Sequence, residues 1–199
     1  MTLKERIIRN KEGKIIFDDF FSDFKDKYVR NVLSQLVKEG KLVRLARGVY
    51  YRPIHTRLGI LYPQVEDVVA AIAKRDHAQI LPTGNTALHQ LGFTTQVPMN
   101  YEFLTNGSAR EITLEKRTIH LKRGVPSNFS YRGKLMPMLH QAMRAIGKDT
   151  ITEGDVAHIA HLLLAHPEPR TWQYDIKLLP AWERNIVQPI IQNYHEQMD

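Results

Sequence analysis

The residues with the clearest chemical capacity form two groups between residues 25 and 53. The first group shares one face of a predicted helix at residues 25–39, and each side chain can donate a hydrogen bond: Lys27, Arg30, Asn31, Ser34 and Lys38. The second group is cationic and lies on a predicted hairpin directly after that helix: Lys41, Arg44 and Arg47. Side chains of these types donate to phosphate oxygens and to base edges. The two groups therefore predict contact with nucleic acid.

The helix is predicted from its apolar spacing. Residues 25–39 carry five apolar side chains at helical intervals, which define one buried stripe: Val29, Val32, Leu33, Leu36 and Val37. Winding the segment at about 100° per residue places the donor group opposite the stripe, with Arg30 at its flank. Gly40 is expected to end the helix, because glycine enters the left-handed cap conformation without a steric penalty.

The cationic group follows on a predicted β-hairpin. Residues 41–44 and 49–52 are expected to form its two strands, and residues 45–48 the tight turn between them. Pro53 closes this unit. The hairpin would carry its cations towards the DNA backbone beside a helix whose width the major groove admits.

The residues before the helix supply the other parts of the same unit. Thr2 and Glu5 fit a capping box that starts a helix at residues 3–9. Residues 15–17 are expected to form a short strand that pairs with the hairpin, and Asp18 to begin a short helix. Three short helices, a strand and a hairpin are the parts of a winged helix-turn-helix.

The charge distribution supports a division into two domains. Residues 1–57 hold 14 Lys and Arg against 7 Asp and Glu, a net charge of +7, whereas residues 58–199 hold 14 of each sign. All the excess positive charge therefore lies in the predicted winged helix-turn-helix. A basic domain joined to a neutral one indicates a nucleic-acid module and a module with a different partner.

The second domain is predicted to be a mixed α/β domain, which makes the fold class of the chain α+β. A connector at residues 54–63 leads to a helix at residues 64–74. A small sheet is expected up to about residue 125, with strands near residues 78–81, 101–105, 110–114 and 117–122.

A helical portion is expected over residues 133–199. Its helices are predicted at residues 135–146, 152–165 and 178–194, and Thr152 and Asp155 fit a capping box for the second of them. Residues 166–169 contain two prolines and are expected to stop that helix. Pro189 is expected to bend or restart the last one.

Several classes of protein are excluded by composition. The chain has no cysteine, so disulfides, thiol catalysis and thiolate metal sites are excluded. No apolar run approaches the roughly 20 residues needed to cross a bilayer, and the first five residues lack the apolar core of a signal peptide. We therefore expect a cytoplasmic protein that does not enter the membrane.

The carboxylates do not form a catalytic arrangement. The pairs Glu66–Asp67 and Asp18–Asp19 lie at predicted helix starts, where the helix dipole favours negative charge. The sequence places no nucleophile beside a base. We expect no catalytic residue and no enzymatic activity.

Metal and cofactor sites are not expected either. His158, His161 and His166 lie close together, and the first two share a helix face, but a His-Glu-x-x-His pattern is absent. Residues 82–86 (PTGNT) lack the Gly-x-x-x-x-Gly-Lys-Ser/Thr pattern of a phosphate-binding loop. We interpret them as a turn and helix cap.

Two stretches resemble a known family. Residues 36–51 (LVKEGKLVRLARGVYY) are similar to the helix end and wing of AbiEi-like antitoxins, the antitoxin half of type IV toxin-antitoxin systems. Residues 82–94 (PTGNTALHQLGFT), followed by Val97 and Pro98, resemble the motif that opens the second domain of that family. Many bacterial regulators share the wing pattern, and the order and separation of both stretches make the resemblance more specific.

The resemblance implies two activities. In that family the amino-terminal winged helix represses the antitoxin's own operon, and the following domain opposes a toxin that resembles nucleotidyltransferases. Matched positions imply DNA contact by the wing, at Lys41, Arg44, Arg47 and Gly48, and a structural role for residues 84–92. The expected partners are double-stranded operator DNA, bound by two copies on an inverted repeat, and a cognate nucleotidyltransferase-like toxin.

Two other functions fit the same residues. The protein would be a stand-alone winged-helix transcriptional regulator if its second domain dimerises or senses a ligand. It would be a protein-interaction adaptor if its winged helix never binds DNA.

Overall fold

The computed structural model describes residues 1–198, and these form two compact units. The first unit contains Met1–Asp76 and Arg110–Ile119. The second contains His77–Ala109 and the described residues from His120 onwards. The described residues hold eight α-helices and three small sheets, so the predicted α+β class is confirmed.

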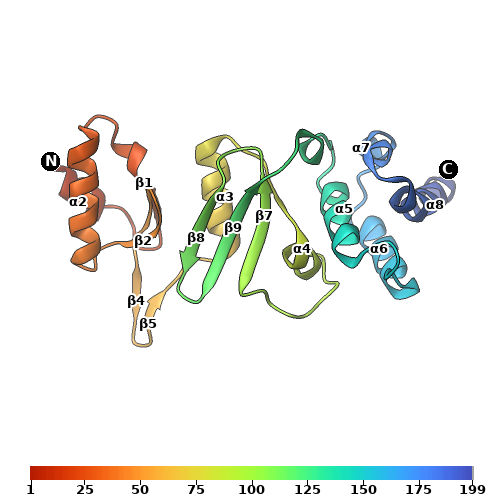
Figure 1. The fold of residues 1–199 in the computed structure, drawn as a ribbon, viewed down its shortest axis with the longest axis horizontal. Coiled ribbons are helices and arrows are strands. Elements are labelled where there is room, and N and C mark those ends of the chain that lie inside the picture. The colour runs from red at the N-terminus through yellow and green to blue at the C-terminus, as the bar shows by residue number, and fades with distance from the viewer. Residues whose placement is uncertain (199) are drawn as a thin grey trace. The chain divides into compact units, whose positions relative to one another are not determined.

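The first unit begins with the predicted winged helix-turn-helix. Its elements are α1 (Leu3–Ile8), β1 (Ile15–Phe17), the 3-10 helix η1 (Asp18–Phe21), α2 (Asp26–Lys38), β2 (Val43–Ala46) and β3 (Val49–Tyr51). The strands form an antiparallel sheet beside α2 (Figure 1), and its strand order is β1-β3-β2. In this sheet Ile16 and Arg44 both pair with Tyr50. The expected pairing of residues 15–17 with the hairpin is confirmed.

A single apolar cluster holds the winged helix together. It joins α1, β1 and the inner face of α2, and its buried members are Leu3, Ile7, Ile16, Phe21, Val29, Val32, Leu33, Leu36, Leu42 and Tyr50. Four residues of the predicted stripe are buried, and Val37 is partly buried at its edge. The Thr2–Glu5 capping box that starts α1 is also present.

The predicted connector at residues 54–63 is wrong, because this segment contains a second hairpin. Its strands are β4 (Ile54–Thr56) and β5 (Gly59–Leu61), which pair with each other in a separate two-stranded sheet. Helix α3 (Val65–Asp76) follows. Strand β8 (Arg110–Leu114), much later in the chain, lies beside β2.

The remaining strands belong to a four-stranded sheet. Its members are β6 (Ile80–Pro82), β7 (Asn100–Thr105), β9 (Arg117–Arg123) and β8, in the order β6-β7-β9-β8. The division between the units runs through β9. Helix α3 and strand β8 were expected in the second domain, but both pack in the first unit. The functional boundary at residues 57 and 58 stays a prediction.

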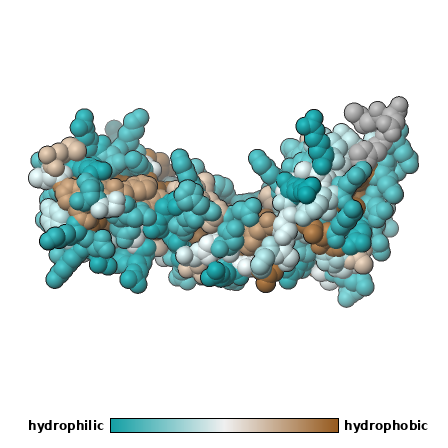
Figure 2. All heavy atoms as spheres, turned by 90° about the horizontal axis from the view of Figure 1, so that it is seen from above, coloured by the Kyte–Doolittle hydropathy of each residue, from teal (hydrophilic) through white to brown (hydrophobic). Residues whose placement is uncertain are grey.

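The second unit is largely helical. Its helices are α4 (Gly84–Gln90), η2 (Pro126–Phe129), α5 (Leu135–Ile146), α6 (Glu153–Ala165), α7 (Pro169–Asp175), η3 (Ile176–Leu178) and α8 (Ala181–Met198). One apolar core joins all of these except η2, with Met136, Leu139, Ile159, Leu163 and Trp172 buried. Hydrophilic side chains cover most of the face of the protein seen in Figure 2.

Helix α7 is absent from the sequence prediction, which interpreted residues 166–169 only as a stop. Pro169 occupies the first turn of α7, where its missing N–H costs no helical hydrogen bond. The helix is held by carboxylates that accept from amides before and at the start of α5: Asp175 accepts from Arg132 and Gly133, and Glu168 from Lys134 and Leu135. This pairing spans distant residues, so local sequence does not reveal it.

The last predicted helix is present as α8, and one of the two expectations for Pro189 is wrong. Pro189 lies inside one continuous helix, which excludes the expected restart. None of the helices in residues 1–198 is long and apolar enough to cross a membrane.

Candidate nucleic-acid interface

The structure places the predicted donor group on the exposed face of α2. The side chains of all five members are exposed: Lys27, Arg30, Asn31, Ser34 and Lys38. They are exposed because the opposite face of α2 is buried in the winged-helix core. The arrangement can offer cationic, amide and hydroxyl donors to one ligand surface.

Two further side chains on α2 were missed by the sequence analysis. Tyr28 is exposed, and its ring lies 6.1 Å from that of Phe24. Gln35 is also exposed and donates to Glu39 Oε1 at 2.9 Å. Hydrogen bonds from Lys4 and Gln35, with the nearby charges of Lys4 and Lys41, lower the pKa of Glu39. That carboxylate therefore stays negative at the end of the helix.

The cations predicted on the wing are exposed as well. Lys41 precedes β2, Arg44 lies within β2, and Arg47 lies in the turn to β3. The turn is shorter than predicted, because β2 continues to Ala46 and only residues 47 and 48 connect the strands. Leu45 is buried, which draws this residue into the core instead of the turn. A register irregularity between Arg44 and Ala46 accommodates it.

The wing turn packs tightly against the start of η1. Gly48 has a φ of +75°, and a Cβ at this position would lie 2.9 Å from Asp18 Oδ1. The amide of Asp18 donates to the carbonyl of Gly48 at 3.2 Å, and Asp18 Oδ1 accepts from the amide of Asp19 at 3.0 Å. Glycine is therefore required at this turn for both its backbone conformation and its small size.

Carboxylates gather where α2 begins. Asp18, Asp19 and Asp26 line a cavity of about 210 Å³, and Arg30 also lines it. Asp26 occupies the first turn of α2, where the helix dipole stabilises a negative charge. The surface beside the wing turn is thus less cationic than the sequence count implies.

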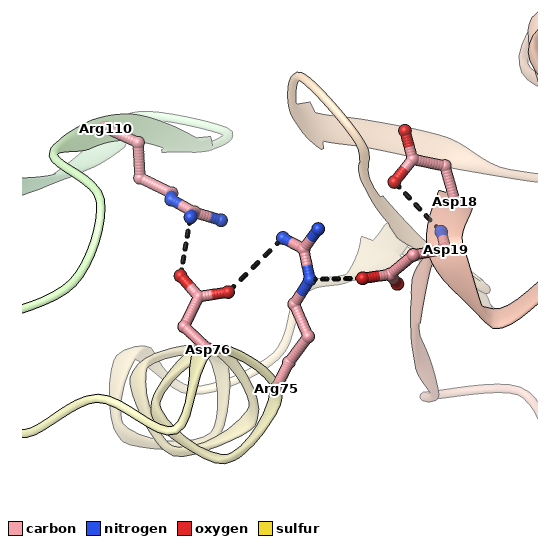
Figure 3. Close-up of polar contacts among 5 residues, drawn as sticks. All are labelled: Asp18, Asp19, Arg75, Asp76 and Arg110. Atoms are coloured by element: carbon pink, nitrogen blue, oxygen red, sulfur yellow. Dashed lines mark hydrogen bonds and ion pairs between the residues drawn. The ribbon is translucent and has the colours of Figure 1, made fainter.

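A chain of ion pairs fixes η1 of the winged helix to α3 and β8 (Figure 3). Arg75 Nε lies 2.8 Å from Asp19 Oδ2, and Arg75 Nη1 lies 3.4 Å from Asp76 Oδ1. Arg110 Nη2 lies 2.6 Å from Asp76 Oδ2. The guanidinium of Arg75 also lies 5.0 Å from the centre of the Phe17 ring. The winged helix is therefore attached to two elements outside residues 1–57.

In the second unit, residues 82–86 (PTGNT) make hydrogen bonds that join neighbouring elements. Thr83 precedes α4, but its hydroxyl donates to Gln141 Oε1 at 2.7 Å and does not cap the helix. Thr86 Oγ1 accepts from the amide of Glu102 at 2.7 Å. These bonds join α4 to α5 and β7. The interpretation of these residues as a helix cap is confirmed, because Thr83 is the N-cap residue of α4, although its side chain makes no capping hydrogen bond.

The histidines of α6 are likewise engaged by neighbouring residues. His158 Nε2 lies 2.7 Å from the carbonyl oxygen of Leu91, and its ring lies 6.4 Å from that of His161. The expected shared face is confirmed. Among residues 1–198, no three His, Cys, Asp or Glu side chains are grouped so that they could hold a metal ion.

Comparison with known proteins identifies a family across most of the chain. A family described as being of unknown function, DUF6088, matches residues 2–170. The chain belongs to the DUF6088 family. The match covers the winged helix, both larger sheets and the helices up to the start of α7. No curated protein matches this DUF6088 sequence.

The close approach at the wing turn can be tested with two glycines of similar backbone conformation. Gly40 has a φ of +68° and open space around its Cβ position, whereas Gly48 faces Asp18. We expect Gly40→Ala to lower the free energy of unfolding by about 1–2 kcal/mol. Gly48→Ala should cost about 1 kcal/mol more, because it also displaces the Asp18 carboxylate. Urea unfolding measures both, and equal losses would contradict the tight packing.

The ion-pair chain predicts that the free energy of unfolding is unusually sensitive to substitution of Asp76. The side chains of Asp76 and Arg110 are only 14% and 17% exposed. Asp76→Ala would leave two arginines facing each other, so we expect a loss of about 2–3 kcal/mol in the free energy of unfolding. Asp67→Ala, an exposed change on the same helix, should cost about 0.5 kcal/mol. Thermal unfolding compares them, and a similar loss in both variants would refute a structural role for the chain.

Proposed function

We propose that this protein is the antitoxin of a type IV toxin-antitoxin system, that it binds operator DNA through its winged helix, and that it represses its own operon. The carboxyl-terminal portion counteracts a nucleotidyltransferase-like toxin. The proposal assigns the protein no enzymatic activity. The exposed donor face of α2 is the observation that carries the DNA-binding part.

Shape and charge support binding to duplex DNA. Helix α2 is 13 residues long and presents its five donors away from the core. An α-helix fits the major groove, where such donors reach base edges, while Lys41, Arg44 and Arg47 contact phosphates. Two copies on an inverted repeat would place their α2 helices about one turn of DNA apart.

The toxin-directed part of the proposal has different support. It rests on the resemblance of residues 36–51 and 82–94 to AbiEi-like antitoxins. In the structure residues 82–94 span the end of β6, all of α4 and the residues after it, and Thr83 and Thr86 join these elements to α5 and β7. A motif that organises the second unit in this way suits a family signature.

A second candidate function is a regulator that responds to a small molecule. A cavity of about 320 Å³ in the second unit favours it, because this is the lower end of the size of small-molecule sites. Phe129, Tyr131 and Met138 contribute apolar lining, and Asn128 and Lys134 contribute polar groups. In this alternative no toxin partner exists and a ligand in the cavity changes the affinity for DNA.

Fluorescence anisotropy with the duplex upstream of the protein's own gene tests DNA binding. Arg30→Ala should cost about 1–3 kcal/mol and relax sequence preference if Arg30 reads a base. Arg47→Ala should weaken binding to all duplexes and reduce the salt slope by about one, as expected for a phosphate contact. Lys148→Ala, an exposed cation in the second unit, serves as the charge-matched control. Equal and weak binding of the wild type to upstream and scrambled duplexes would sink the repressor proposal.

Co-expression with the neighbouring gene product tests the antitoxin role. The full chain should restore growth of cells that express a toxic nucleotidyltransferase-like neighbour. Arg47→Ala should still restore growth when both genes are driven from inducible promoters, because its defect lies in DNA binding. Continued growth arrest with a demonstrably toxic neighbour and a folded wild-type chain would exclude the antitoxin role. The ligand-responsive regulator would then be the function to test.

A further inference from the structure

The β4–β5 hairpin has a well-defined tip. Its register pairs Ile54 with Leu61 and Thr56 with Gly59, so residues 57 and 58 form the connecting turn. Thr56 Oγ1 donates to the carbonyl of Gly59 at 2.8 Å and accepts from the amide of Leu58 at 3.2 Å. These bonds hold the two tip residues in a fixed arrangement.

The tip presents an arginine and a leucine to solvent. Leu58 has 101% of its reference exposure, and Arg57 is also exposed. A fully exposed leucine side chain forgoes the stabilisation that burial of its apolar surface would give, which a bound surface would recover. Figure 1 shows the hairpin projecting away from the three-stranded sheet of the winged helix.

The base of the hairpin is anchored to that sheet. Tyr51 Oη donates to the carbonyl of Leu61 at 2.8 Å, and its ring stacks on that of Tyr62 with centroids 6.5 Å apart. A Cβ on Gly13 would lie 3.1 Å from Ile54 Cδ1, so the turn before β1 also packs on the hairpin. The direction of the hairpin is therefore fixed by the winged helix itself.

The anchoring places the hairpin at the basic end of the winged helix. Arg52 Nη1 donates to the carbonyl of Lys41 at 2.9 Å, and the amide of Arg52 donates to the carbonyl of Lys14 at 2.9 Å. The end of α2, the turn before β1 and the hairpin base are thus tied together, and they carry these cations: Lys11, Lys14, Lys38, Lys41 and Arg52. The carboxylates nearby in sequence are Glu12 and Glu39, and Glu39 is paired with Lys4.

We propose that the β4–β5 hairpin is a second DNA-contacting arm, which places Arg57 in the minor groove beside the major-groove segment that α2 occupies. Leu58 packs against the sugars and base edges of that groove. An arginine with an adjacent apolar residue is a pair that minor-groove proteins use, and the cations at the hairpin base match the flanking phosphates. This inference rests on the proposed DNA-binding function and adds a contact outside the wing.

Two tip variants and one matched control test the arm. Arg57→Ala should lower the affinity for the upstream duplex by about fivefold to tenfold and reduce the salt slope by about one. Leu58→Ser should lower the affinity by about threefold with an unchanged salt slope, because it removes only apolar contact. Lys116→Ala removes an exposed cation from the turn between β8 and β9 in the same unit and should change neither quantity.

Hydroxyl-radical footprinting locates the contact, because the radical attacks sugars through the minor groove. The wild type should protect a minor-groove patch beside the α2 site, and both tip variants should lose that patch only. If Arg30→Ala weakens binding but the tip variants keep wild-type affinity and footprint, the arm is refuted and DNA binding stands. If the tip variants bind DNA normally and lose rescue of the toxin, the tip contacts protein instead. If the wild type binds no duplex specifically, the underlying function fails first.

Discussion

The carboxylate of Asp76 is the contact on which the first compact unit depends. It accepts a hydrogen bond from Arg110 on β8 and forms an ion pair with Arg75 on its own helix (Figure 3). Arg75 in turn donates to Asp19, and its guanidinium lies over the Phe17 ring. Each guanidinium needs this negative charge because both side chains are mostly withdrawn from water. The winged helix is consequently part of a larger body, and these ion pairs help to fix its position relative to α3 and β8.

Acidic and basic side chains of the winged helix gather at opposite ends of α2. Asp18, Asp19 and Asp26 lie where α2 begins, and the cations tied together by Arg52 lie where it ends. A polyanion that meets both regions would be attracted more strongly at the end of α2 than at its start. The buried stripe of α2 determines which face is exposed, and under the proposed DNA binding the uneven charge would determine how that face is oriented along a duplex.

Local signals in the sequence predicted much of the winged helix. The stripe from Val29 to Leu36, the Thr2–Glu5 capping box and the limits of α5 follow from residues close in the chain. The hairpin at β4–β5 was missed because Pro53 and Pro63 indicated a connector. The fit of Gly48 to Asp18 and the reach of Arg75 to Asp19 join residues 30 or more positions apart, which no periodicity encodes. The exposure of the eight predicted donors follows from their spacing, whereas the acidic cavity beside Arg30 depends on how η1 packs against α2, which the spacing does not give.

The first compact unit is discontinuous, since Arg110–Ile119 completes a body that begins at Met1. During synthesis, residues 77–109 leave the ribosomal tunnel before Arg110–Ile119 do. At about 5–20 residues per second, this takes a few seconds. During that interval Asp76 has no Arg110 and β2 has no β8 beside it. Each newly made chain therefore passes through a stage in which the winged helix is synthesised but its body is open, and completion of this unit is timed by translation of a segment that belongs to the other.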